Sequence, residues 1–137
     1  MLAEILGVRK GVTAVIGGGG KTTLLRTLGE ELARSGARVI LATTTKFLPF
    51  PGIETVPGGE REVAEALGRA PIVCAAAPWG ESGKLAASPV PMVRLRALAD
   101  YVLVEADGSA GLPLKAHAPH EPVIPACARQ TVYVLGV

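Results

Sequence analysis

Short apolar runs alternate along the chain with segments in which apolar residues recur every three or four positions. The runs are typical of strands buried on both faces of a parallel sheet, and we expect such strands at 12–16, 38–42, 72–76, 101–104 and 131–135. The periodic segments predict helices from Leu24 to a stop at Ser35-Gly36, over 59–70, and from a cap at Ser88-Pro89 through Ala99. This alternation predicts right-handed crossovers and an α/β fold, a three-layer parallel sheet.

The segments between these elements are rich in proline and glycine. We expect loops over 49–59 and 113–125, the latter with four prolines, and an open segment over 78–87. The 137 residues fit a single domain covering 1–137. The sequence stops two residues after the last expected strand, where such a fold normally adds a covering helix. We therefore expect a fragment of a longer protein, with a sheet face that a missing segment or a second copy, as in a homodimer, would bury.

A glycine-rich stretch lies between the first expected strand and the first expected helix, and this is the context in which such a stretch binds phosphate. It comprises Gly17, Gly18, Gly19 and Gly20, followed by Lys21, Thr22 and Thr23. Glycines let backbone N–H groups approach phosphate oxygens, and the helix start adds a partial positive charge. Lys21 would contact the terminal phosphates, and the Thr22 hydroxyl would hold Mg²⁺. The alternative is a flexible glycine turn with an incidental lysine.

The motif differs from the usual phosphate loop, G-x-x-x-x-G-K-[ST], because Val15 stands where the first glycine is expected. The sequence reads G-x-x-G-K-T, two residues shorter. In this respect it resembles the shortened phosphate loop of the Mur-type ATP-dependent ligases. The resemblance implies a P-loop nucleotide-binding domain that still presents lysine and threonine to a nucleotide.

Two carboxylates follow the fourth expected strand, where P-loop enzymes place the acid that holds Mg²⁺ or its water. Glu105 ends the apolar run, and Asp107 lies two positions later. In an extended chain both side chains point the same way, so both could face the phosphates. We take Lys21, Glu105 and Asp107 as candidate catalytic residues and Thr22 and Glu105 as candidate metal ligands. The alternative is that Asp107-Gly108 is simply a turn.

Further polar residues could contact a second substrate. Thr44 and Lys46, in the run T-T-T-K, follow the second expected strand at the same sheet edge, although the threonines could equally continue that strand. His117 and His120 are spaced H-x-x-H, but no third ligand is near enough in the sequence to favour zinc. Trp79 could stack on a base, but a lone tryptophan more often packs against its own domain.

Composition and charge narrow the function further. A net charge of +2, with no basic run longer than Arg9-Lys10, does not indicate nucleic-acid binding. No uncharged apolar run approaches the ~18 residues of a membrane span, and Glu4 interrupts the basic-then-apolar order of a signal peptide. We expect a cytoplasmic protein without membrane contact, with Cys74 and Cys127 as reduced core thiols.

Three segments together resemble the YqeC-type family of accessory proteins of selenium-dependent molybdenum hydroxylases. They are V-I-G-G-G-G-K-T-T, A-T-T-T-K and V-L-V-E-A-D-G-S-A-G-L-P-L-K-A-H-A-P-H-E-P-V-I-P, and the similarity runs over nearly the whole chain. The resemblance implies maturation of a selenium- and molybdenum-containing cofactor. It also implies that a loop near the second substrate carries Lys115, His117, His120 and Glu121.

The leading hypothesis is a Mg²⁺-dependent protein that binds and hydrolyses ATP or GTP in this maturation. ATP is preferred because no Asn/Thr-Lys-x-Asp motif for guanine is present. One alternative is an assembly factor whose affinity for a partner enzyme, here a molybdenum hydroxylase, is controlled by the bound nucleotide. Another is a ligase-like enzyme that forms an acyl phosphate, which would need a further domain.

Overall fold

The structure is a computed structural model, and it describes residues 1–106 and 124–134. Asp107 and the candidate loop residues lie outside these ranges. The helices are α1 (Leu2–Leu6), α2 (Lys21–Arg34), α3 (Glu60–Arg69) and α4 (Met92–Leu98). The strands are β1 (Gly11–Gly17), β2 (Val39–Thr43), β3 (Lys46–Phe47), β4 (Thr55–Val56), β5 (Ile72–Trp79), β6 (Lys84–Ala87), β7 (Tyr101–Glu105) and β8 (Ala128–Val134).

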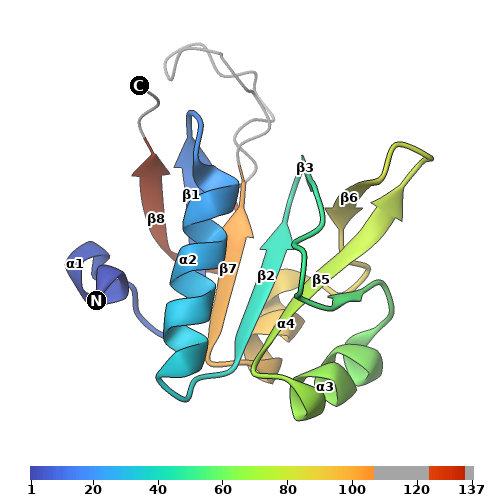
Figure 1. Cartoon of the computed structure of the whole chain (residues 1–137), viewed down its shortest axis with the longest axis horizontal. Coiled ribbons are helices and arrows are strands. Elements are labelled where there is room, and N and C mark those ends of the chain that lie inside the picture. The colour runs from blue at the N-terminus through green and yellow to red at the C-terminus, as the bar shows by residue number, and fades with distance from the viewer. Residues whose placement is uncertain (107–123, 135–137) are drawn as a thin grey trace.

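The centre of the fold is a parallel sheet in the strand order β5-β2-β7-β1-β8 (Figure 1). These strands correspond to the five expected from the apolar runs. Strand β4 pairs in parallel with β5, while β6 and β3 extend the sheet with antiparallel pairs. The described chain is therefore an α/β fold with a mixed sheet.

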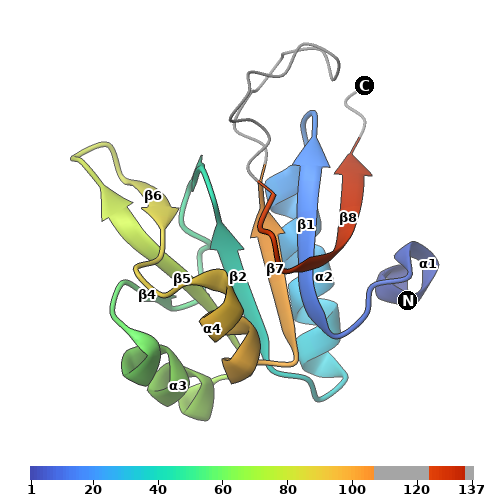
Figure 2. The same ribbon diagram turned by 180° about the vertical axis from the view of Figure 1, so that it is seen from behind.

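Helices cover both faces of this sheet. In β2, Val39 and Leu41 pack in the cluster beneath α2, whereas Ile40 and Ala42 pack in the cluster beneath α3 and α4. This alternation follows from the strand period of two, and it explains why residues 39–42 are all apolar. Figures 1 and 2 show α2 on one side of the sheet and α4 on the other. The three-layer arrangement is thus as expected.

Two expected segments differ in the structure. The segment 78–87 is not open, because β5 continues to Trp79 and β6 returns beside it in register from Ala76↔Ala87 to Trp79↔Lys84. Its one proline and two glycines favoured a loop, but cross-strand hydrogen bonds stabilise a hairpin around the turn. The expected loop 49–59 likewise contains the short strand β4. The purely parallel sheet was therefore wrong at this edge.

The start of the fourth helix also differs from the expectation. Pro91, and not Ser88, is the N-cap residue of α4. The Ser88 hydroxyl instead accepts a hydrogen bond from the Val90 N–H at 3.0 Å, which forms a local turn before the helix. Helix α1 was not expected, since its five residues are too few to show a helical period. None of the helices in the described ranges combines the length and apolarity needed to cross a bilayer.

Strand β8 is held against β1 at the glycine loop. The Gly18 N–H donates a 2.7 Å hydrogen bond to the Val134 carbonyl oxygen. A Cβ atom on Gly17 would lie 2.0 Å from that same oxygen, and Gly17 has φ of +116°. Only glycine therefore lets the two backbones approach so closely here.

We predict that Gly17→Ala destabilises the fold by about 2 kcal/mol or more, because β8 must move away from β1. The matched control is Gly19→Ala, two residues along the same loop, where an added Cβ meets nothing within 4 Å. Urea unfolding should show the loss for Gly17→Ala, and the control should stay within about 0.5 kcal/mol of the parent. Equal stabilities of the two variants would contradict this close packing.

Candidate functional site

The glycine loop connects the carboxyl end of β1 to the first turn of α2. Gly20 is the N-cap residue of α2 and has φ of +92°, a left-handed conformation that favours glycine. Gly20 has no side chain with which to cap this helix end. A 14-residue helix that begins at a glycine leaves its N-terminus open to an anion. Gly19 and Gly20 are exposed, so a ligand can reach the loop.

Lys21 folds back over this loop. Its Nζ donates a hydrogen bond of 2.9 Å to the Gly17 carbonyl oxygen, and the residue is half-buried. The ammonium group is thereby held beside the same backbone that would surround a phosphate. The structure thus brings the predicted lysine and glycines together.

Glu105 and Thr22 meet at the carboxyl edge of the sheet. The Thr22 hydroxyl donates a hydrogen bond to Glu105 Oε1 at 3.2 Å. Glu105 is only 6% exposed, although carboxylates are seldom so deeply buried without specific partners. Its position follows from the pairing of β7 with β1, in which Glu105 lies opposite Val15, two residues before the loop. The two predicted metal ligands are therefore in contact.

The end of β2 fixes the backbone of Glu105. The buried Thr43 hydroxyl donates to the Glu105 carbonyl oxygen at 3.0 Å, and the Thr44 N–H donates to the same oxygen at 3.1 Å. Thr43 Oγ1 also accepts the Thr45 N–H at 3.0 Å. Thr43 thus positions Glu105. The sequence pattern indicated Thr44 and Lys46 in this run, whereas the role of Thr43 follows only from the pairing of β2 with β7.

Of the remaining candidates, the structure describes Lys46 and Trp79. The Lys46 amine lies 4.0 Å from the centroid of the Trp79 ring, a cation–π contact at the edge of the sheet. Trp79 is 50% exposed, so it does not pack fully against the domain. The structure does not describe the other predicted site residues, so it does not test whether they belong to this site. They are Asp107, Lys115, His117, His120 and Glu121.

The two cysteines are free thiols with different surroundings. Cys74 is buried, and this burial raises its pKa to about 12, only partly offset by a hydrogen bond from Thr55. Cys74 lies in the core as expected, whereas Cys127 is half-buried and packs against the core cluster beneath α3 and α4. Within 1–106 and 124–134, no group of three His, Cys, Asp or Glu side chains is placed to hold a metal ion.

The chemistry available at the site follows from its charges. Lys21 and the N-terminus of α2 offer positive charge to phosphate oxygens, while the Thr22 hydroxyl and the Glu105 carboxylate offer oxygen ligands to a hard cation. Mg²⁺ commonly takes one or two protein oxygens and completes its shell with water and phosphate. The described residues therefore fit a magnesium-bound polyphosphate.

Comparisons with known proteins agree on one family. The family model described as "YqeC protein" matches residues 13–137. A protein of Escherichia coli (strain K12) described as "Uncharacterized protein YqeC" is 37% identical over 134 residues, which cover 93% of this chain and 52% of that protein. The chain therefore spans about half the length of this relative. No solved structure matches. With the family model extending over nearly the whole chain, the protein belongs to the YqeC family.

Proposed function

We propose that this chain binds the magnesium complex of a nucleoside triphosphate, ATP or GTP, and hydrolyses it. The observation that carries the proposal is the 3.2 Å hydrogen bond from the Thr22 hydroxyl to the Glu105 carboxylate. Thr22 is the second residue of α2, and Glu105 is the last residue of β7. A hydroxyl behind a phosphate loop and a carboxylate at the adjacent strand end are the two protein groups that commonly hold Mg²⁺ in P-loop proteins.

The loop and helix would bind the phosphates. Backbone N–H groups of Gly19 and Gly20 and of the first turn of α2 would donate to phosphate oxygens, with Lys21 on the terminal phosphates. In the structure Lys21 donates to Gly17, so the proposal requires the ammonium group to exchange this carbonyl for a phosphate oxygen. A charge-assisted bond to phosphate is the stronger of the two, which favours that exchange.

Thr22 and Glu105 would hold the Mg²⁺ ion, directly or through one of its waters. When bound, the ion neutralises charge that develops on the transferred phosphoryl group. The chain's own contribution is to fix the carboxylate before the ion arrives. The Thr43 hydroxyl and the Thr44 N–H donate hydrogen bonds to the Glu105 carbonyl oxygen. These bonds fix the backbone that carries the Glu105 side chain.

The cellular role proposed here is maturation of a selenium- and molybdenum-containing cofactor. It is supported by the resemblance of the chain to accessory proteins of selenium-dependent molybdenum hydroxylases, and such a hydroxylase or its cofactor would be the partner. Hydrolysis would drive either a chemical step on that cofactor or a change in affinity for the hydroxylase. Formation of a modified small molecule identifies the first. Slow, stoichiometric hydrolysis that a hydroxylase stimulates identifies the second.

We predict that Lys21→Ala lowers the affinity for Mg-ATP and Mg-GTP about 10- to 100-fold, because one charge-assisted contact to phosphate is lost. Isothermal titration calorimetry with each nucleotide measures this change. The control is Lys84→Ala, which removes an exposed lysine from β6 and leaves the loop intact. Unchanged dissociation constants for Lys21→Ala would remove the proposed phosphate site.

We also predict that Glu105→Gln lowers the hydrolysis rate about 100-fold or more while changing nucleotide affinity less, because the carboxylate serves the metal and not the phosphates. Thr22→Val should act in the same direction. Rates measured across a magnesium titration test both variants, and Glu65→Gln on the exposed surface of α3 is the control. Parent rates in both variants would show that the contact between Thr22 and Glu105 is only structural.

A further inference from the structure

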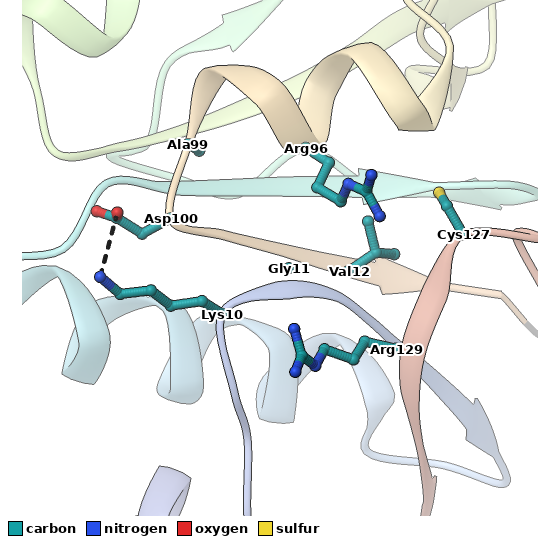
Figure 3. A pocket seen from close by; sticks show the side chains of 8 residues that line it. All are labelled: Lys10, Gly11, Val12, Arg96, Ala99, Asp100, Cys127 and Arg129. Atoms are coloured by element: carbon teal, nitrogen blue, oxygen red, sulfur yellow. Dashed lines mark ion pairs between the residues drawn. The ribbon is translucent and has the colours of Figure 1, made fainter.

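A pocket lies at the amino end of the sheet, at the end of β1 opposite the glycine loop. Gly11 and Val12, which begin β1, form part of its wall, whereas the glycine loop follows the last residue of the same strand. The cavity has a volume of about 590 Å³ (Figure 3). Three structural regions supply the other lining residues: the residue before β1, the end of α4 with the segment that follows it, and the start of β8 with the turn that precedes it. These residues are Lys10, Arg96, Ala99, Asp100, Cys127 and Arg129.

The charges of this pocket are unbalanced. Three of its lining side chains are cationic and one is anionic. The anion, Asp100, is already engaged at both oxygens: Oδ1 lies 3.8 Å from Lys10 Nζ, and Oδ2 accepts the Arg38 N–H at 2.9 Å. Across the described part of the chain, neither Arg96 nor Arg129 forms an ion pair. Two guanidinium groups therefore border one cavity without an ion-pair partner among the described residues.

The frame that carries these guanidinium groups is well fixed. The Gly11 N–H donates to the Asp100 carbonyl oxygen at 2.9 Å, which joins the start of β1 to the start of β7. Gly11 has no side chain, and a Cβ there would lie 3.6 Å from Arg129 Cδ, so the arginine stem lies along this bare backbone. In Figure 3 the Arg96 side chain extends from α4 toward Val12, and the Arg129 side chain extends from β8 past Gly11 toward Lys10, so the two guanidinium groups border the pocket from different sides.

We propose that this pocket is a second ligand site, which binds a small molecule through an oxyanion, a phosphate or carboxylate group held by Arg96 and Arg129. Guanidinium groups match the geometry of both oxyanions and bind them with paired N–H donors. Arg96 is in the last turn of α4, where a cation also offsets the helix dipole. That role does not account for Arg129, which lies on a strand.

The size and charge of the pocket define the ligand class. A volume of about 590 Å³ lies in the range of small-molecule sites, roughly 300–1,000 Å³. Two unneutralised cations favour a dianionic group, either one phosphate or a pair of carboxylates. Because the site and the glycine loop lie at opposite ends of β1, the ligand can bind whether or not a nucleotide is present. The proposal therefore does not depend on the proposed nucleotide site.

Cys127 provides a local reporter for this site, since it lines the pocket and is half-buried. Iodoacetamide labelling followed by mass spectrometry measures the alkylation rate of this thiol in the intact chain. Sodium phosphate, pyrophosphate and citrate serve as probes, and potassium chloride at matched ionic strength is the blank. Cys74 is the internal reference, because it is buried and its raised pKa keeps it a thiol.

We expect phosphate, pyrophosphate or citrate to slow alkylation of Cys127 several-fold relative to chloride. The more effective probe identifies the class, with phosphate or pyrophosphate indicating a phosphate group and citrate indicating carboxylates. Arg96→Gln and Arg129→Gln should each raise the protecting concentration about 10-fold, whereas Arg96→Lys should retain part of the effect. Arg61→Gln removes an exposed cation from α3, and in this variant the anions should protect Cys127 at the same concentrations as in the parent.

Lys21→Ala separates this site from the glycine loop, and its Cys127 should be protected like that of the parent. Urea unfolding of each variant ensures that alkylation is compared between folded chains. Absence of protection by all three probes would overturn the proposal. Protection that survives in the Arg96→Gln/Arg129→Gln double variant, or that disappears in Lys21→Ala, would overturn it equally.

Discussion

The parallel pairing of β1 with β7 fixes the relative positions of the other strands and of both candidate sites. Its register runs from Gly11↔Tyr101 to Val15↔Glu105, so the ends of both strands are fixed together. At the carboxyl end this places Glu105 beside the first turn of α2 and within reach of Thr22. Were the register shifted by one residue, the side chain of Glu105 would turn to the other face of the sheet.

Hydrogen bonds to the backbone then fix the ends of β2 and β8 relative to this pair of strands. The Glu105 carbonyl oxygen accepts from Thr43 at the end of β2, while the Val134 carbonyl oxygen accepts from Gly18 in the loop. Buried peptide groups must find such partners, and here the partners come from the edges of the candidate site. The same bonds that complete the sheet therefore hold the loop, the carboxylate and β8 in one arrangement.

The two ends of the sheet carry different kinds of positive charge. At the carboxyl end, the positive charge comes from a helix N-terminus and one lysine, close to a carboxylate and a hydroxyl suited to a cation. At the amino end, it comes from two arginines with no carboxylate partner among the described residues. Guanidinium groups cannot lose their charge at physiological pH, so the amino-end pocket stays cationic whatever occupies the loop. The proposed sites thus require ligands of different chemistry, a magnesium-bound polyphosphate and a free oxyanion.

The five parallel strands and the helices α2 and α3 could be predicted from residue order alone, because the periods of two and 3.6 are local properties of the chain. The glycine loop with Lys21 and Thr22 could be predicted in the same way, since these residues are consecutive. The continuation of β5 into an antiparallel hairpin is seen only in the folded chain, because cross-strand hydrogen bonds outweigh the local preference of Pro78 and Gly80 for a loop. The folded chain alone also shows that Thr43 supports Glu105, 62 positions away, and that Arg96 and Arg129 share a pocket. These contacts depend on strand order, which is set by the burial of whole faces and cannot be seen in any single segment.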